Sequence, residues 1–130
     1  MNSLEKDFVP YEPSLALKEL GFNEPCFGYY KENQYELHKE FHCYNSDYVE
    51  HLEVYIAAPT FSQAFRWFRD KYQIDSKIER DNSLQNLPKQ YCYIIDDKDG
   101  LVEESINFNS YEEAELACLI KLIEITNEQQ

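Results

Sequence analysis

Four side chains of the types that bind transition metals occur close together in the sequence: His38, His42, Cys43 and His51. A zinc site needs four ligands in a tetrahedral arrangement, usually anchored by closely spaced pairs. The spacing of four between His38 and His42 aligns two imidazoles only on a helix, but the neighbouring residues are typical of an extended chain or a loop. No second closely spaced pair is present. We therefore interpret this cluster as polar surface and expect neither a metal nor another cofactor.

The run Asp-Asp-Lys-Asp-Gly at 96–100 contains part of the pattern of a calcium-binding loop. When Asp97, Asp99 and Gly100 occupy the third, fifth and sixth positions of an EF-hand loop, Ile95 falls at the first position and Ile106 at the twelfth. Both of those positions require a carboxylate. The run is better explained as a hairpin turn.

Motifs of nucleophilic catalysis are also missing from the sequence. There is no G-x-S-x-G, no cysteine in a basic context that opens a helix, and no glycine-rich phosphate loop. Carboxylate pairs such as Glu103/Glu104 and Glu112/Glu113 arise readily in a chain with 25 acidic residues, so they do not indicate a glycosidase. We expect a protein that is not an enzyme.

The distribution of charge is more informative than any motif. The chain carries 25 acidic and 12 basic residues, for a net charge of −13. Residues 96–115 contain one basic residue, Lys98, and eight acidic ones: Asp96, Asp97, Asp99, Glu103, Glu104, Glu112, Glu113 and Glu115. Residues 66–80 are instead slightly basic, which predicts a molecule with two electrically different sides. The acidic segment is either a solvated face or a surface that docks on the basic groove of a partner protein.

The stretch 59–72 predicts a helix that begins after Thr60, which is a suitable N-cap. Apolar side chains recur at intervals of three and four residues and predict a buried stripe: Phe61, Ala64, Phe65, Phe68 and Tyr72. Arg66, Trp67 and Arg69 lie outside this stripe. Because arginine and tryptophan are favoured anchors of protein interfaces, this edge of the helix is the second candidate for partner contact.

The remaining elements follow from periodicity and turn residues. A short helix is expected over 13–20 with Gly21 after its end, and Ser110 with Glu113 predicts the start of a closing helix that buries Tyr111 and Cys118. The expected strands are a hairpin over 26–38, an irregular strand pair or loop over 38–48, and strands at 49–56, 74–79, 90–96 and 101–108. This order predicts an α+β fold, an antiparallel sheet of about four to six strands with three helices mainly on one face. We expect a single globular domain over 1–130, with 1–12 as an extended arm.

Composition excludes several classes of protein. Direct binding of a phosphate backbone needs a basic face, which this acidic chain does not favour, so we expect no direct nucleic-acid binding. The sequence has no apolar run of 18 residues and no secretory leader, and we expect a cytoplasmic protein that does not contact membranes. Its four cysteines lack paired spacing and are expected to be reduced and mostly buried: Cys26, Cys43, Cys92 and Cys118.

Three segments together resemble a group of small, mostly uncharacterised proteins of phages and prophages of Bacteroidota. The segments are LALKELGFNEPCFGYY at 15–30, APTFSQAFRWFRDKY at 58–72 and SYEEAELACLIKLIE at 110–124. The resemblance spans nearly the whole chain, with 38–50 and 73–90 diverging most, and it assigns no chemistry. Some phage accessory proteins of this size and acidity inhibit host defence, including anti-CRISPR proteins, so the resemblance implies that setting.

Three hypotheses follow from these observations. The first is a non-enzymatic phage protein that binds and blocks a host nucleic-acid-processing defence protein, with an RNA-guided nuclease as the candidate target. The second is a housekeeping or structural accessory protein of the phage whose acidic surface keeps it in solution. The third is a small metal-dependent enzyme that uses the region from His38 to His51.

Overall fold

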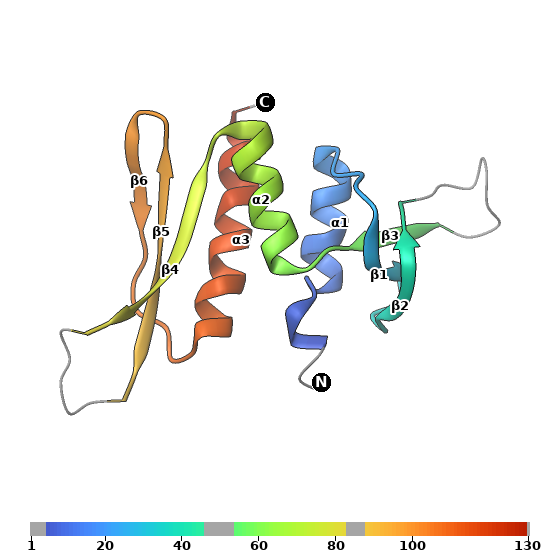
Figure 1. Cartoon of the computed structure of the whole chain (residues 1–130), viewed down its shortest axis with the longest axis horizontal. Coiled ribbons are helices and arrows are strands. Elements are labelled where there is room, and N and C mark those ends of the chain that lie inside the picture. The colour runs from blue at the N-terminus through green and yellow to red at the C-terminus, as the bar shows by residue number, and fades with distance from the viewer. Residues whose placement is uncertain (1–4, 46–53, 83–87, 130) are drawn as a thin grey trace. The chain divides into compact units, whose positions relative to one another are not determined.

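The computed structural model describes residues 5–45, 54–82 and 88–129, which form two compact units (Figure 1). Unit 1 is Met1–Ala64 and unit 2 is Phe65–Gln130. Among the described residues there are three α-helices and six β-strands, which confirms the α+β class. The strands form two antiparallel sheets of three strands rather than one larger sheet. The division arises because a helix separates the first three strands from the last three, and each set pairs within itself.

Unit 1 contains a three-stranded sheet and one helix. Its elements are a 3-10 turn at Glu5–Asp7, α1 (Tyr11–Leu20), β1 (Cys26–Lys31), β2 (His38–Cys43) and β3 (Tyr55–Ala58). The strand order is β2-β1-β3, and β1 and β2 form an antiparallel hairpin. The hairpin expected over 26–38 is right for the first strand only, because residues 34–37 form no strand and the second strand begins at residue 38. The part of the expected strand at 49–53 lies outside the described residues.

Aromatic side chains of unit 1 gather between the sheet and α1. Tyr11 and Tyr30 meet edge to face with ring centroids 5.5 Å apart, and the hydroxyl of Tyr30 donates a hydrogen bond to the carbonyl of Val9 at 2.9 Å. The ring of Phe8 lies so close to Gly28 that a Cβ there would meet it at 3.0 Å. Gly28 therefore allows the N-terminal segment to pack on β1, and this segment is a turn and a buried anchor more than an extended arm.

Helix α1 begins two residues earlier than expected and ends at the predicted residue. Tyr11 is its first residue, so Pro13 lies within the first turn, where a missing backbone N–H leaves no hydrogen bond unmade. Gly21 adopts φ 103°, a left-handed conformation that glycine adopts without steric cost. The backbone N–H groups of Gly21 and Phe22 donate to the carbonyls of Lys18 and Leu17 and close the helix.

Helix α2 (Phe61–Tyr72) crosses the boundary between the units and is capped as predicted, because the hydroxyl of Thr60 accepts a hydrogen bond from the backbone N–H of Gln63 at 3.2 Å. The buried stripe differs from the expected one at a few positions. Phe61, Ala64 and Phe68 are buried as expected, and Trp67 joins them, whereas Phe65 and Tyr72 are only half-buried. Trp67 fits the same face because residues 60, 64, 67 and 71 share one side of a helix.

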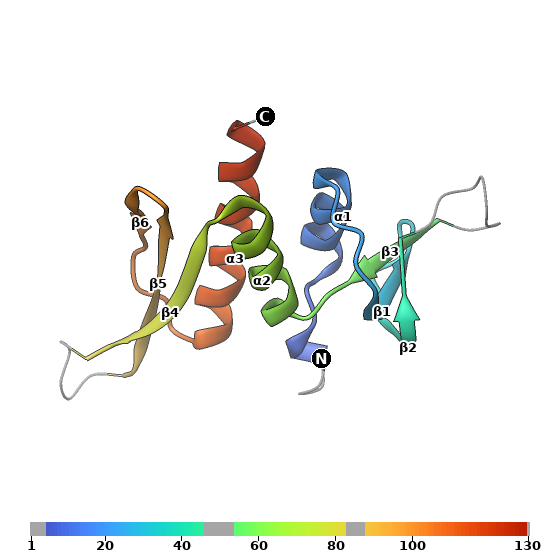
Figure 2. The ribbon, with the colours of Figure 1, turned by 45° about the horizontal axis from the view of Figure 1, so that its top comes forward.

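Unit 2 contains the second sheet, in the order β4-β5-β6, and the closing helix. Its elements are β4 (Asp75–Asp81), β5 (Gln90–Asp97), β6 (Gly100–Glu104) and α3 (Tyr111–Glu128). Lys98 and Asp99 form the turn from β5 to β6, as the sequence predicts. Helix α3 packs against β5 and β4 on one face of this sheet, as Figures 1 and 2 show.

The centre of the contact between α3 and the sheet is apolar. Ala114, Cys118 and Leu122 of α3 and Ile95 of β5 are all fully buried. The hydroxyl of Ser110 accepts a hydrogen bond from the backbone N–H of Glu113 at 3.1 Å, so the predicted N-cap is present. Tyr111 was expected to be buried, but it is exposed, because it stands at the first residue of the helix beside the edge of Tyr91.

Candidate functional site

The two faces of the β4-β5-β6 sheet differ in composition. Strand pairing places Tyr93 and Ile95 on the face that α3 covers. The side chains of the opposite face, which we call the outer face, are Asp75, Lys77, Glu79, Asp81, Gln90, Cys92, Ile94, Asp96, Leu101 and Glu104. Figure 2 shows α3 on the other side of this sheet and no helix of unit 2 on the outer face.

The outer face carries five carboxylates and one ammonium group. Asp75 is directly opposite Asp96 in the β4–β5 register. Like charges directly opposite in a sheet reduce its stability, so folding alone gives no reason for this arrangement. Lys77 forms an ion pair with Glu79 at 3.1 Å, and this pair, with Asp96 nearby, raises the pKa of Lys77.

Cys92 lies in the centre of the outer face, and the carboxylates around it affect the pKa of its thiol. Burial raises the pKa of its thiol, and the carboxylates of Glu104, Glu79 and Asp81 raise it further. A thiol that holds its proton is neither a nucleophile nor a metal ligand. The arrangement therefore attracts cationic groups and offers no activated nucleophile.

The eight acids of residues 96–115 do not form one surface. Only Asp96 and Glu104 belong to the outer face. Glu103, the neighbour of Glu104, points to the other side of the sheet, as alternation along a strand requires.

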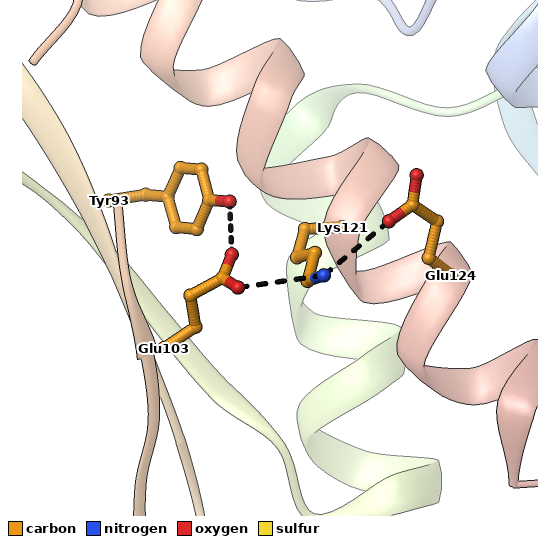
Figure 3. A network of polar contacts seen from close by, with 4 residues as sticks. All are labelled: Tyr93, Glu103, Lys121 and Glu124. Carbon is orange, nitrogen blue, oxygen red and sulfur yellow. Dashed lines mark hydrogen bonds and ion pairs between the residues drawn. The ribbon is translucent and has the colours of Figure 1, made fainter. Parts of the chain in front are cut away.

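Glu103 is held in a network of polar contacts that links the sheet to α3 (Figure 3). Its carboxylate accepts a short hydrogen bond from the hydroxyl of Tyr93 and lies 3.5 Å from the ammonium nitrogen of Lys121. The same ammonium lies 3.6 Å from Glu124. Burial, followed by the bond to Glu103, raises the pKa of Tyr93. Glu103 therefore has a structural role in unit 2, and its assignment to a partner-binding surface stays a prediction.

The other five acids belong to turns and to the start of α3. Asp97 accepts a hydrogen bond from the backbone N–H of Asp99 at 2.8 Å within the hairpin turn. Glu112 and Glu113 are exposed in the first turn of α3, where negative charge is favourable. Glu115, two residues farther along the helix, is half-buried. The positions of Asp97, Glu112 and Glu113 therefore have structural reasons.

Three acids of the outer face are not among the contact residues predicted from the sequence: Asp75, Glu79 and Asp81. Asp75 and Glu79 lie in the segment 66–80 that was counted as basic, so the division of charge by segment is wrong for β4. Asp75, Glu79 and Asp81 lie an even number of positions away from Lys77, so all four lie on the same face of the strand. The alternation of residues within 75–81 is the sequence signal that places them together.

The edge of α2 has fewer exposed side chains for contact with a partner than the sequence predicts. Trp67 is only 7% exposed, and its ring contacts those of Phe68 and Tyr72, with centroids 5.0 and 5.5 Å away. The ammonium nitrogen of Lys71 lies 5.0 Å from the centre of the same ring. Trp67 is therefore not available as an exposed anchor, and the candidate contacts that remain on this helix are Arg66 and Arg69, both exposed.

The proposed metal ligands can be followed only in part. The ring of His38 stacks on that of Tyr29, with centroids 5.0 Å apart. The side chains of His42 and Cys43 and the whole of His51 lie outside the described residues. Within the part of the chain that is described, no three metal-binding side chains converge, and no helix has the length and apolar character needed to cross a membrane.

Comparison of the chain with protein-family models, with curated proteins and with solved structures gives no match.

Proposed function

We propose that this chain acts by binding and that its outer face docks on a basic, nucleic-acid-binding groove of a host protein. Bound there, the chain excludes nucleic acid from the groove and inhibits the host protein. The observation that carries the proposal is the outer face itself, where five carboxylates with one lysine surround Cys92, Ile94 and Leu101.

The physical basis is electrostatic complementarity. Acidic side chains on one face attract a basic groove before contact, and they accelerate association more than they slow dissociation. The like-charged pair of Asp75 and Asp96 is unfavourable in the free protein. A cationic side chain of the partner placed between the two carboxylates would remove this repulsion. Binding would therefore relieve an electrostatic repulsion that is present in the folded, unbound chain.

The biological setting comes from the resemblance to phage and prophage proteins of Bacteroidota. In that setting the partner is a defence protein of the bacterial host that processes nucleic acid, and an RNA-guided nuclease is the leading candidate. No catalytic activity of the chain and no cofactor enters this proposal.

The test begins with a tagged protein that captures its partner from a lysate of a Bacteroidota host. The captured partner is then purified, and association is measured for the wild type and for a variant with Asp75→Asn, Glu79→Gln, Asp96→Asn and Glu104→Gln. Neutralising the outer face should slow association about tenfold at low salt, because long-range attraction is lost. The difference should shrink above about 0.1 M salt, where charges farther apart than about 10 Å are screened.

A control neutralises three acids outside the outer face, Asp99, Glu112 and Glu113, one charge fewer than the outer-face variant. This control should associate nearly as fast as the wild type. If the two variants slow association equally, net charge and not the outer face governs binding. If instead Arg66→Glu with Arg69→Glu abolishes binding while the outer-face variant retains it, α2 is the interface. Nucleic acid should compete with the wild-type chain for the partner, and simultaneous binding of both would refute the proposed inhibition.

A further inference from the structure

Strand β6 is an edge of the β4-β5-β6 sheet. It pairs with β5 along one side, and among the described residues of unit 2 no strand pairs with its other side (Figure 1). An edge strand presents backbone N–H and C=O groups that can accept another strand, and natural proteins usually protect such edges.

The two edges of this sheet are protected to different degrees. β4 carries charged side chains of both signs at most of its positions, which is a common way of blocking an edge. On β6, Leu101 is 63% exposed and Val102 is 42% exposed, and Ile106 just beyond the strand is 79% exposed. A strand added beside β6 would cover these apolar side chains, whereas one added beside β4 would have to pair with a row of charges.

Backbone directions identify the groups that a new strand would meet. The backbone N–H of Ser105 donates to the carbonyl of Tyr93 at 3.0 Å, and the register continues through Glu104 opposite Ile94 and Glu103 opposite Ile95. Alternate residues of an antiparallel strand turn their backbone groups toward and away from a given neighbour. Ser105 and Glu103 therefore face β5, and the N–H and C=O of Glu104 point away from the sheet.

We propose that β6 receives an extended segment of the basic partner as a fourth strand. The segment has lysine or arginine at alternate positions, because alternate side chains of an added strand share the outer face with Glu104 and Asp96. This inference rests on the proposed function and specifies how the partner is held: main-chain hydrogen bonds to β6 fix the segment, and the acids of the outer face select its charge.

A second copy of the chain is a poorer occupant of this edge. Pairing of β6 with β6 would bring Glu103 and Glu104 of one copy next to those of the other, and like charges in neighbouring strands repel. Each copy also carries a net charge of −13, which opposes self-association.

The experiment uses a labelled synthetic peptide of alternating lysine and valine as the probe, with binding to the full chain followed by fluorescence anisotropy. Glu104→Pro removes an N–H that points away from β5, so the β5–β6 hydrogen bonds persist. Glu104→Gln removes the same charge and keeps the N–H. Binding of the peptide should be about tenfold weaker to Glu104→Pro than to Glu104→Gln, since a main-chain hydrogen bond is lost and the proline ring obstructs the edge.

A second measurement varies the peptide and leaves the chain unchanged. A peptide of alternating lysine and proline has the same charge but no N–H on its proline residues, and it should bind the wild type at least about tenfold more weakly than the lysine–valine peptide. Equal binding of the two peptides, or of the two Glu104 variants, would overturn strand addition while the electrostatic proposal could still hold. If neutralising Asp75, Glu79, Asp96 and Glu104 leaves peptide binding unchanged, the proposed function fails as well. Concentration-dependent dimerisation abolished by Glu104→Pro would assign the edge to a second copy and overturn this inference.

Discussion

Replacing Glu103 by alanine should destabilise the fold, whereas the same change at the adjacent Glu104 should not. The two residues are neighbours on β6 with identical chemistry, but Glu103 joins Tyr93 to Lys121 and Glu104 is exposed on the outer face. The comparison therefore separates a structural role from a surface role without changing the size or charge of the deleted group.

The magnitude follows from the two interactions that Glu103 makes. A hydrogen bond to a charged acceptor contributes about 1.5–3 kcal/mol, and Tyr93, which donates it, is buried. The ion pair with Lys121 adds less than about 1 kcal/mol, because the side chains of Lys121 and Glu103 are 32% and 33% exposed. Glu103→Ala should therefore lower the free energy of unfolding by about 2–3 kcal/mol. Glu104→Ala should change it by less than about 0.5 kcal/mol, as exposed substitutions generally do.

Urea unfolding followed by circular dichroism measures both values, and an unchanged slope with denaturant would show that the same surface is exposed on unfolding. Tyr93→Phe and the double variant complete a mutant cycle, in which the coupling between Tyr93 and Glu103 should be about 1–2 kcal/mol. The pKa of Tyr93 should also fall in Glu103→Ala, because the carboxylate that favours the protonated phenol is gone. Equal losses at positions 103 and 104, or a coupling near zero, would refute the assignment of Glu103 to the structural network.

Two further predictions concern the buried aromatic residues. Phe68 is fully buried and Phe65 only half-buried, so Phe68→Ala should cost about 3–5 kcal/mol in urea unfolding and Phe65→Ala distinctly less; equal costs would contradict the burial seen on α2. Burial, and secondarily Glu5, raises the pKa of Tyr30 from 10.0 to about 12. Because the folded state holds this proton more tightly, its contribution is complete below about pH 10 and is lost as the pH rises to about 12, amounting to about 1.4 kcal/mol lost at pH 11. Tyr30→Phe should remove this part of the pH dependence, and an unchanged alkaline slope in the variant would show that Tyr30 does not titrate in this way.

Local signals in the sequence were sufficient for most elements of the fold. Thr60 and Ser110 cap their helices, Gly21 ends α1, and the Asp97–Gly100 turn joins β5 to β6, since each of these features depends on backbone chemistry within a few residues. The grouping of strands was not predictable in this way. Whether six strands form one sheet or two depends on pairing between segments distant in the sequence, and the individual alternation patterns do not specify partners.

The acidic surface shows the same distinction between local and long-range information. Charge counted along the chain grouped Asp96 with Glu103, which are separated by the sheet, and assigned Asp75 to a basic segment although it is opposite Asp96. The strand register determines which of these residues share a face. Two residues paired across neighbouring strands lie on the same face of the sheet, whereas two consecutive residues of one strand lie on opposite faces.

The charge of the outer face has a consequence for how the chain can fold and bind. Asp75 and Asp96 oppose each other at the end of the β4–β5 ladder, and the cross-strand repulsion of such a pair is up to about 1 kcal/mol. The ladder tolerates it because the opposite face of the same strands buries Ile95 and Tyr93 under α3, and burying an aliphatic side chain as large as Ile95 contributes about 1.5–3 kcal/mol. One face of the sheet therefore stabilises the fold, and this stabilisation exceeds the cost of the like charges on the other face.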